Sequence, residues 1–157
     1  MTLKYFYKSD VFTFYSLSGK DSLDLINRLS TNNISDVHNK VTKTIFTNEN
    51  GRIIDVVSIW KINDKKLLLI CNTKNKNLLI EWIEKFTFDE EIHLKESNKY
   101  ELIHTFTDSR AINLENFDLD GSNIKQYNDK FESFFISKSS FFNQHETIDL
   151  LFDKELS

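Results

Sequence analysis

The stretch Thr47-Asn48-Glu49-Asn50-Gly51-Arg52-Ile53-Ile54-Asp55-Val56-Val57 contains the features that decide the expected fold. Asn50-Gly51 is a strong signal for a β-hairpin, because both residues tolerate the positive φ angles that a tight turn between strands requires. Residues 41–47 before the turn and 52–62 after it are rich in β-branched and apolar side chains. The sequence therefore predicts one strand on each side of this turn.

One carboxylate, Asp55, is set into the second of these strands. If the strand alternates regularly, one side carries Ile53, Asp55, Val57, Ile59 and Lys61, and the other carries Ile54, Val56, Ser58, Trp60 and Ile62. Neither side is purely polar, so both are expected to be partly buried, and a buried lone charge is costly. Two interpretations stay open. Asp55 pairs with Arg52, Lys43 or another base, or it lies at a pocket edge and contacts a nitrogen-rich ligand.

The flanking sequence adds further strands and two amphipathic helices. Strands are predicted over 11–17 and 66–71. Helices are predicted on the apolar faces formed by Leu23, Leu25, Ile26 and Leu29, and by Leu78, Leu79, Trp82, Ile83 and Phe86. The first helix should end near Ser30, and Thr73 is the expected N-cap of the second.

The C-terminal part is expected to hold shorter elements. A strand pair is predicted over 90–95 and 99–107, further strands over 110–114 and 131–136, a loop over 115–130, and a final helix around 148–152. Strands come in consecutive runs instead of alternating strictly with helices. The sequence therefore predicts an α+β fold, with an antiparallel β-sheet and helices packed on one face.

Composition narrows the functional classes. The net charge is −4 and no basic block occurs, so direct nucleic-acid binding, tRNA included, is not expected. The lone cysteine, Cys71, excludes an intrachain disulfide and is predicted to be a small core residue. The four histidines form no metal-binding pattern, and no apolar run reaches the roughly 18 residues of a membrane span. We expect a cytoplasmic protein that uses no metal and contacts no membrane.

Five segments in order carry a family resemblance. They are Ser18–Ser22, Leu29–Ile34, Phe46–Asp55, Leu69–Thr73 and Lys85–Ser97. Together they resemble the folate-binding domain of the glycine-cleavage T-protein (aminomethyltransferase) family, which includes the YgfZ-like proteins of iron–sulfur cluster maintenance. The resemblance is strongest over 11–107. It implies a folate-binding-domain architecture and a tetrahydrofolate cofactor.

The resemblance also implies roles for individual residues. Asp55 matches the first of two family acids and is the only catalytic candidate. Val56 occupies the position of the second acid, which contacts the folate nitrogens, and valine accepts no hydrogen bond. Ser58 and Trp60 match positions that line the pterin pocket, and Asn72 matches a ligand-contacting asparagine. Two interpretations of Trp60 stay open: it stacks on a pterin ring, or it is a core aromatic residue. Val56, Ser58, Trp60 and Asn72 are therefore the expected cofactor-binding residues.

Two departures from the family shape the expected function. Family members are about twice as long and carry a C-terminal β-barrel domain, whereas we expect residues 1–157 to form a single folate-binding-like domain, with an unassigned tail over 108–157. Lys138–His145 resembles either a degenerate YgfZ motif, in which Ser140 replaces the functional cysteine, or a degenerate form of the K-x-x-F-I-G segment of the T-protein.

The sequence thus predicts a tetrahydrofolate-binding accessory protein of one-carbon metabolism or iron–sulfur maintenance. Such a protein would be non-catalytic, or a weak aminomethyltransferase-like transferase. The alternative is a ligand-free interaction module that forms a homodimer or pairs with another chain.

Overall fold

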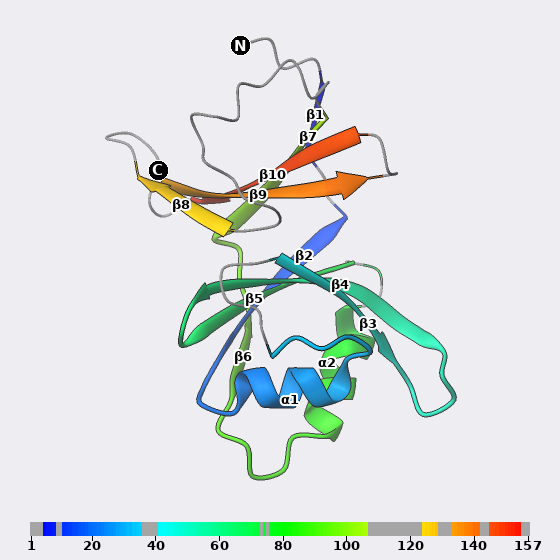
Figure 1. Ribbon diagram of the computed structural model, residues 1–157. Coiled ribbons are helices and arrows are strands. Elements are labelled where there is room, and N and C mark those ends of the chain that lie inside the picture. Colours follow the sequence, from blue (N-terminus) through cyan, green and yellow to red (C-terminus); the bar gives the residue numbers. More distant parts are fainter. Residues whose placement is uncertain are drawn as a thin grey trace. The chain divides into compact units, whose positions relative to one another are not determined.

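The computed structural model describes residues 5–8, 11–35, 41–72, 74, 76–106, 124–128, 133–141 and 145–154 (Figure 1). The chain divides into two compact units. One is formed by residues 11–98, and the other combines residues 1–10 with 99–157. The single folate-binding-like domain expected over 1–157 stays a prediction.

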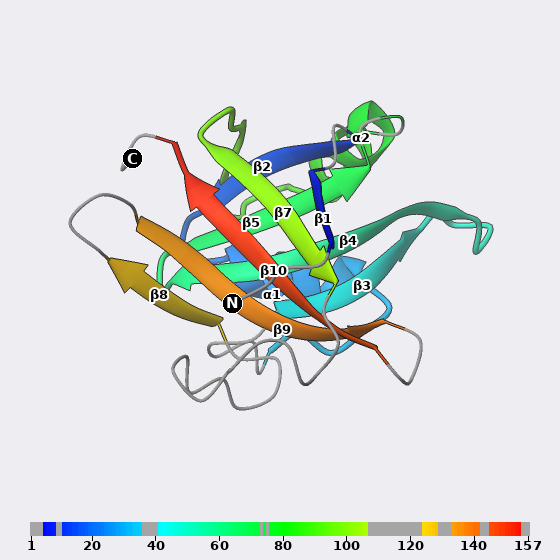
Figure 2. The ribbon, with the colours of Figure 1, turned by 90° about the horizontal axis from the view of Figure 1, so that it is seen from above.

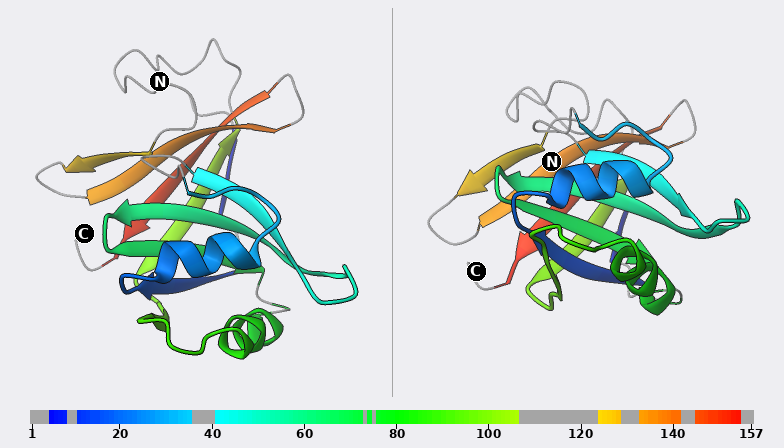
Figure 3. Two further views of the ribbon diagram at one scale, coloured as in Figure 1. Left: turned by 60° about the horizontal axis from the view of Figure 1, so that its bottom comes forward. Right: turned by 90° about the horizontal axis from the view of Figure 1, so that it is seen from below.

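The unit formed by residues 11–98 is one antiparallel sheet with two helices. Its strands are β2 (Phe12–Ser18), β3 (Val41–Thr47), β4 (Ile53–Asn63), β5 (Lys66–Asn72) and β6 (His93–Glu96), in the order β3-β4-β5-β2-β6. The helices are α1 (Ser22–Leu29) and α2 (Lys76–Lys85), and both cover the same face of this sheet (Figures 1 and 3). The predicted α+β class and the placement of the helices are confirmed.

The core of this unit lies between the sheet and the helices. Strand residues at every second position face the helices, which is the alternation expected of a sheet that is covered on one side. The cluster consists of Tyr15, Leu17, Leu25, Ile26, Ile34, Phe46, Val57, Ile59, Leu67, Leu69, Cys71, Leu79 and Ile83. Each fully buried aliphatic side chain contributes about 1.5–3 kcal/mol relative to an exposed one.

The turn between β3 and β4 has the predicted hairpin form. The Gly51 N–H donates to the Asn48 carbonyl at 2.9 Å, and the Asn48 side-chain oxygen accepts from the N–H groups of Asn50 and Arg52, each at 3.0 Å. Gly51 adopts a φ of 71°, which glycine reaches without steric cost. Just beyond the turn the pairing shifts register between Phe46 and Thr47: Asp55 pairs with the buried Phe46, and Ile53 pairs with Thr47.

The two helices confirm most of the predicted apolar faces. In α1, Leu25 and Ile26 are fully buried, and in α2 so are Leu79 and Ile83. Leu78 is exposed, so its predicted place on the buried face of α2 is wrong. Leu78 precedes Leu79 by one residue, or about 100° of helix rotation, which turns it away from the sheet. Thr73 lies outside the described residues.

The second unit is also an antiparallel sheet. Its strands are β1 (Tyr5–Lys8), β7 (Tyr100–Phe106), β8 (Ile124–Asn128), β9 (Ser133–Phe141) and β10 (His145–Asp153), in the order β1-β7-β10-β9-β8 (Figure 2). In the part of the chain described, neither helix has the length and apolarity that a membrane crossing requires.

Three predictions for this C-terminal part are wrong. The helix expected around 148–152 is strand β10, which pairs with β7 on one side and β9 on the other. The segments 90–95 and 99–107 do not pair with each other, because β6 pairs with β2, and β7 pairs with β1 and β10. Strand β8 lies inside the expected loop 115–130. The strand predicted over 131–136 corresponds to β9, and 110–114 lies outside the described residues.

Candidate ligand-binding site

Strand β4 divides the predicted site residues between its two faces. Asp55 shares the helix-covered face with Val57 and Ile59, which belong to the core cluster. Val56, Ser58 and Trp60 alternate with them and therefore lie on the opposite face. The structure thus separates the candidate acid from the candidate pocket positions.

Asp55 is held by backbone groups. Asp55 is only 5% exposed. Its two carboxylate oxygens accept hydrogen bonds from the N–H groups of Val56 and Asn72, both at 2.8 Å. Neither Arg52 nor Lys43 forms an ion pair with Asp55 in the part of the chain described, so the predicted pairing with these two bases is wrong. Burial raises the pKa of Asp55 above its usual range, and the two backbone hydrogen bonds partly oppose that rise.

These two hydrogen bonds tie β4 to β5 where their regular pairing stops. Register pairs between the strands end at Ser58 and Ile70. Val56 lies two residues before Ser58, and Asn72 lies two residues after Ile70, so the two positions face each other just beyond the last pair. Asp55 bridges this gap from the core side, because its carboxylate replaces a missing ladder contact. We infer that Asp55 positions Val56 and Asn72.

The face that carries Val56 is apolar, with a few polar groups. Ile45 lies opposite Val56, Lys43 and Ile70 flank Ser58, and Val41 and Leu68 flank Trp60. Val56 is 54% exposed, Ser58 and Asn72 are half-buried, and Trp60 is 1% exposed. The Asn72 side-chain oxygen accepts from the Lys74 N–H at 3.1 Å, and within the described residues its amide nitrogen donates to no acceptor. Ligand sites typically have such an apolar lining with a small number of placed polar groups.

Trp60 has a different environment from the other three candidates. Its ring is buried in this structure, so it does not present an open stacking surface on this face. Stacking on a pterin ring would require its cover to move.

Cys71 is a core residue, whereas His104 forms a polar pair on the second sheet. Cys71 is fully buried in the core cluster, where burial and the nearby Asp55 raise its thiol pKa, so the prediction of a small core residue is confirmed. His104 was not singled out by the sequence. Its Nδ1 lies 2.7 Å from Oδ1 of the buried Asp149, its register partner on β10. The two residues lie 45 positions apart in the sequence, so no local pattern signals the pair.

The remaining candidates concern metals and the YgfZ-like segment. No group of three histidine, cysteine, aspartate or glutamate residues that could hold a metal ion occurs among the described residues. Ser140 lies on β9 opposite Glu146, and residues 142–144 of the same segment lie outside the described residues.

Comparison with known proteins identifies the family. The profile of the GCVT N-terminal domain matches residues 8–105, which is more than half of the chain. The chain belongs to the GCVT N-terminal domain family. The resemblance noted in the sequence is thereby confirmed.

Curated relatives of this family member are aminomethyltransferases. The protein from Clostridium botulinum (strain Okra) is 35% identical over 79 residues, which cover 48% of this chain and 21% of that protein. The protein from Staphylococcus epidermidis is 30% identical over 131 residues, which cover 82% of this chain and 36% of that protein. The chain therefore spans about a fifth to a third of the length of these relatives.

Solved structures share the fold of this GCVT-family chain. The glycine cleavage system aminomethyltransferase T from Bartonella henselae superposes with a TM-score of 0.76 at 12% identity, covering 96% of this chain and 42% of that one. Heterotetrameric sarcosine oxidase from Corynebacterium sp. U-96 gives a TM-score of 0.64 at 9% identity, covering 96% of this chain and 75% of that one. The first likeness confirms the predicted folate-binding-domain architecture.

Proposed function

We propose that this protein binds a tetrahydrofolate-type ligand on the face of β4 and β5 that carries Val56, Ser58 and Asn72. The observation that carries the proposal is the pair of positions Val56 and Asn72, fixed by Asp55 in a chain that belongs to the GCVT N-terminal domain family. The curated relatives are named aminomethyltransferases, which supports a one-carbon carrier as the ligand class.

The chemistry of this face favours binding over transfer. The exposed Val56 side chain has no hydrogen-bond acceptor, so it cannot stabilise a cationic ligand nitrogen. Asp55 is the nearest acid, but its oxygens point to backbone N–H groups from the other face of the strand. The Asn72 amide nitrogen is a donor for a ring nitrogen or a carbonyl of the ligand. We therefore propose a non-catalytic or weakly catalytic protein, with aminomethyl transfer as the reaction to test.

Calorimetry with tetrahydrofolate under reducing conditions tests binding. The intact chain should bind in the micromolar range, and Val56→Lys and Asn72→Ala should each weaken binding by about tenfold or more, as expected for loss of a central contact. Leu78→Lys is the matched control, because Leu78 is an exposed apolar residue on helix α2, which covers the other face of the sheet. Absence of binding at millimolar ligand, or equal weakening by Leu78→Lys, would contradict the proposal.

Two further variants separate binding from chemistry. Trp60→Ala tests whether the buried Trp60 ring contributes to ligand binding. Its folding should be checked by circular dichroism because Trp60 is buried. Val56→Asp introduces the acid that the family resemblance implies. The assay measures tetrahydrofolate-dependent release of ammonia from an aminomethyl donor. Release by Val56→Asp but not by the original chain would support the loss of a catalytic acid.

A second candidate function is an interaction module. Ile53, Val56 and Phe88 are exposed apolar side chains in the 11–98 unit, and the sarcosine oxidase whose structure is similar is a heterotetramer. This alternative predicts self-association, or pairing with another chain, in place of folate binding. Light scattering at micromolar concentration tests it, because a monomer that also fails to bind an exposed-patch dye would contradict it.

We propose a cytoplasmic accessory role in one-carbon metabolism or iron–sulfur maintenance. The lone cysteine supports a reducing compartment. Serine at position 140 means that such a role would not use the thiol found in YgfZ-like proteins.

A further inference from the structure

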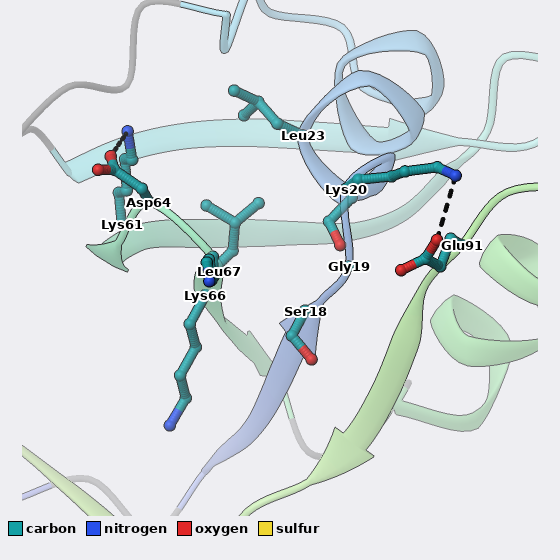
Figure 4. A pocket seen from close by; sticks show the side chains of 11 residues that line it. Ser18, Gly19, Lys20, Leu23, Lys61, Asp64, Lys66, Leu67 and Glu91 are labelled. Carbon is teal, nitrogen blue, oxygen red and sulfur yellow. Dashed lines mark ion pairs between the residues drawn. The ribbon is translucent and has the colours of Figure 1, made fainter.

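A separate pocket lies at the other end of β4 and β5 from Asp55. Its volume is about 440 Å³, and it is formed by the turn before α1, the first turn of α1, the β4–β5 hairpin and Glu91. Figure 4 shows Lys20 extending toward Glu91 and Lys61 toward Asp64 at its rim. All of its lining residues belong to the 11–98 unit.

The start of α1 leaves hydrogen-bond donors without acceptors. Asp21 stands at the N-cap position but makes no side-chain cap hydrogen bond, and the first helical hydrogen bond runs from the Leu25 N–H to the Asp21 carbonyl. Within the described residues, the N–H groups of Leu23 and Asp24 therefore have no acceptor. Uncapped N–H groups and the helix dipole favour an anion at this end of a helix.

Gly19 explains why Asp21 does not cap the helix. Gly19 has a φ of 122°, and a Cβ atom at this position would lie 2.0 Å from the Glu91 carbonyl oxygen. The backbone at Glu91 can therefore pack directly on the turn. The Glu91 N–H then donates to the Asp21 carboxylate at 2.8 Å, which holds that carboxylate away from the helix start.

Ser22 provides an independent sign of a missing ligand. Ser22 lines the pocket and is 4% exposed, yet its hydroxyl has no hydrogen-bond partner. Buried hydroxyl groups are nearly always hydrogen-bonded in native proteins, because an unpaired one costs about 1–3 kcal/mol. Rotation of the Ser22 side chain toward the pocket would let a ligand oxygen satisfy this hydroxyl and the uncapped helix start together.

The charges around the pocket favour an anion. Four lysines and two acids line it, which gives a local excess of two positive charges in a chain of net charge −4: Lys20, Lys61, Lys65, Lys66, Asp64 and Glu91. The Lys20–Glu91 and Lys61–Asp64 ion pairs, at 3.1 and 2.9 Å, are exposed on at least one side. Exposed ion pairs contribute little, so an incoming anion can compete for these lysines.

We propose that this pocket binds a phosphate group, either as free phosphate or as the phosphate of a small monoester. The Ser22 hydroxyl and the N–H groups of Leu23 and Asp24 would donate to its oxygens, and the lysines at the rim would neutralise its charge. The proposal is independent of tetrahydrofolate binding, because the two sites share no residue.

NMR titration of the ¹⁵N-labelled full chain tests the proposal. Inorganic phosphate, glycerol phosphate, acetate and chloride should be compared at constant ionic strength. We expect saturable shifts of the Leu23 and Asp24 amide signals with phosphate or glycerol phosphate. Tighter binding of phosphate would indicate free phosphate as the ligand, and tighter binding of glycerol phosphate would indicate a monoester. Shifts that fail to saturate at tens of millimolar phosphate, or that are equal with acetate, would overturn the proposal.

Two substitutions and a control sharpen the test. Ser22→Ala should weaken phosphate binding by about tenfold, the effect of losing one charge-assisted hydrogen bond. The same variant should not lower the unfolding temperature of the phosphate-free protein, because the hydroxyl is unpaired there. Lys65→Gln should also weaken binding, whereas Lys74→Gln, which removes an exposed lysine outside the pocket, should not. Unchanged phosphate affinity in both Ser22→Ala and Lys65→Gln would overturn the proposal.

Discussion

Replacing Asp55 with alanine should destabilise the 11–98 unit by about 2 kcal/mol. The substitution leaves the N–H groups of Val56 and Asn72 without acceptors, and each orphaned N–H costs about 1–3 kcal/mol. The lower end applies because both residues are partly accessible to water, and because removal of a buried carboxylate relieves its desolvation. Asp55→Asn keeps one acceptor oxygen and should cost about 1 kcal/mol.

Urea unfolding followed by tryptophan fluorescence measures this effect. Trp60 is buried on the opposite face of β4 from Asp55, so its emission should report unfolding of this unit. A loss of about 2 kcal/mol corresponds to a decrease of about 1 M in the urea midpoint. Asp89→Asn is the matched control, because Asp89 is exposed and its substitution should change stability by less than about 0.5 kcal/mol.

The pH dependence gives a second, independent check of the Asp55 environment. Burial raises the pKa of Asp55, so the folded state binds its proton at a higher pH than the unfolded state does. The stability contributed by this group is therefore full below the unfolded pKa of about 3.9, and it decreases as the pH rises through the folded pKa. The stability difference between the original chain and Asp55→Asn should thus be larger at the acidic end of that window than at pH 7. A difference that instead grows toward neutral pH would refute the reasoning, since it would mean that the charged carboxylate is the stabilising form.

The remaining predictions concern packing and backbone conformation in the same unit. Gly51→Ala should lower the free energy of unfolding by about 1–2 kcal/mol, because the φ of Gly51 is positive although no atom lies within 4 Å of the added methyl group. Gly19→Ala should abolish the cooperative thermal transition, because the added Cβ would lie 2.0 Å from the Glu91 carbonyl oxygen. Ile83→Ala, at a fully buried site on α2, should cost about 2–5 kcal/mol in urea unfolding, and Leu78→Ala, at an exposed site on the same helix, less than about 0.5 kcal/mol. Cys71 should react with a thiol reagent at pH 8 only after unfolding, because it is fully buried and its pKa is raised.

Local patterns in the sequence determined most of the 11–98 unit. Asn50-Gly51 and its β-branched flanks specified the β3–β4 hairpin, because turn preference and strand alternation act over a few residues. The apolar spacing of Leu25 and Ile26 located α1 for the same reason. These segments also carry the family resemblance, so the sequence by itself indicates membership of the GCVT N-terminal domain family.

Tertiary structure decided what depended on distant partners. Residues 148–152 have apolar spacing compatible with a helix, but β7 and β9 on either side make this segment a strand, since long-range backbone pairing overrides a weak local preference. The hydrogen bonds of Asp55 depend on Asn72, 17 residues later, and no sequence period announces that contact. The pocket at α1 likewise exists only because Glu91 packs on Gly19 and draws Asp21 away from the helix start, a contact between residues 70 positions apart. Sequence therefore determined most elements of the 11–98 unit and the family, whereas the partners of the polar groups, and with them both candidate sites, were set by contacts that only the folded chain makes.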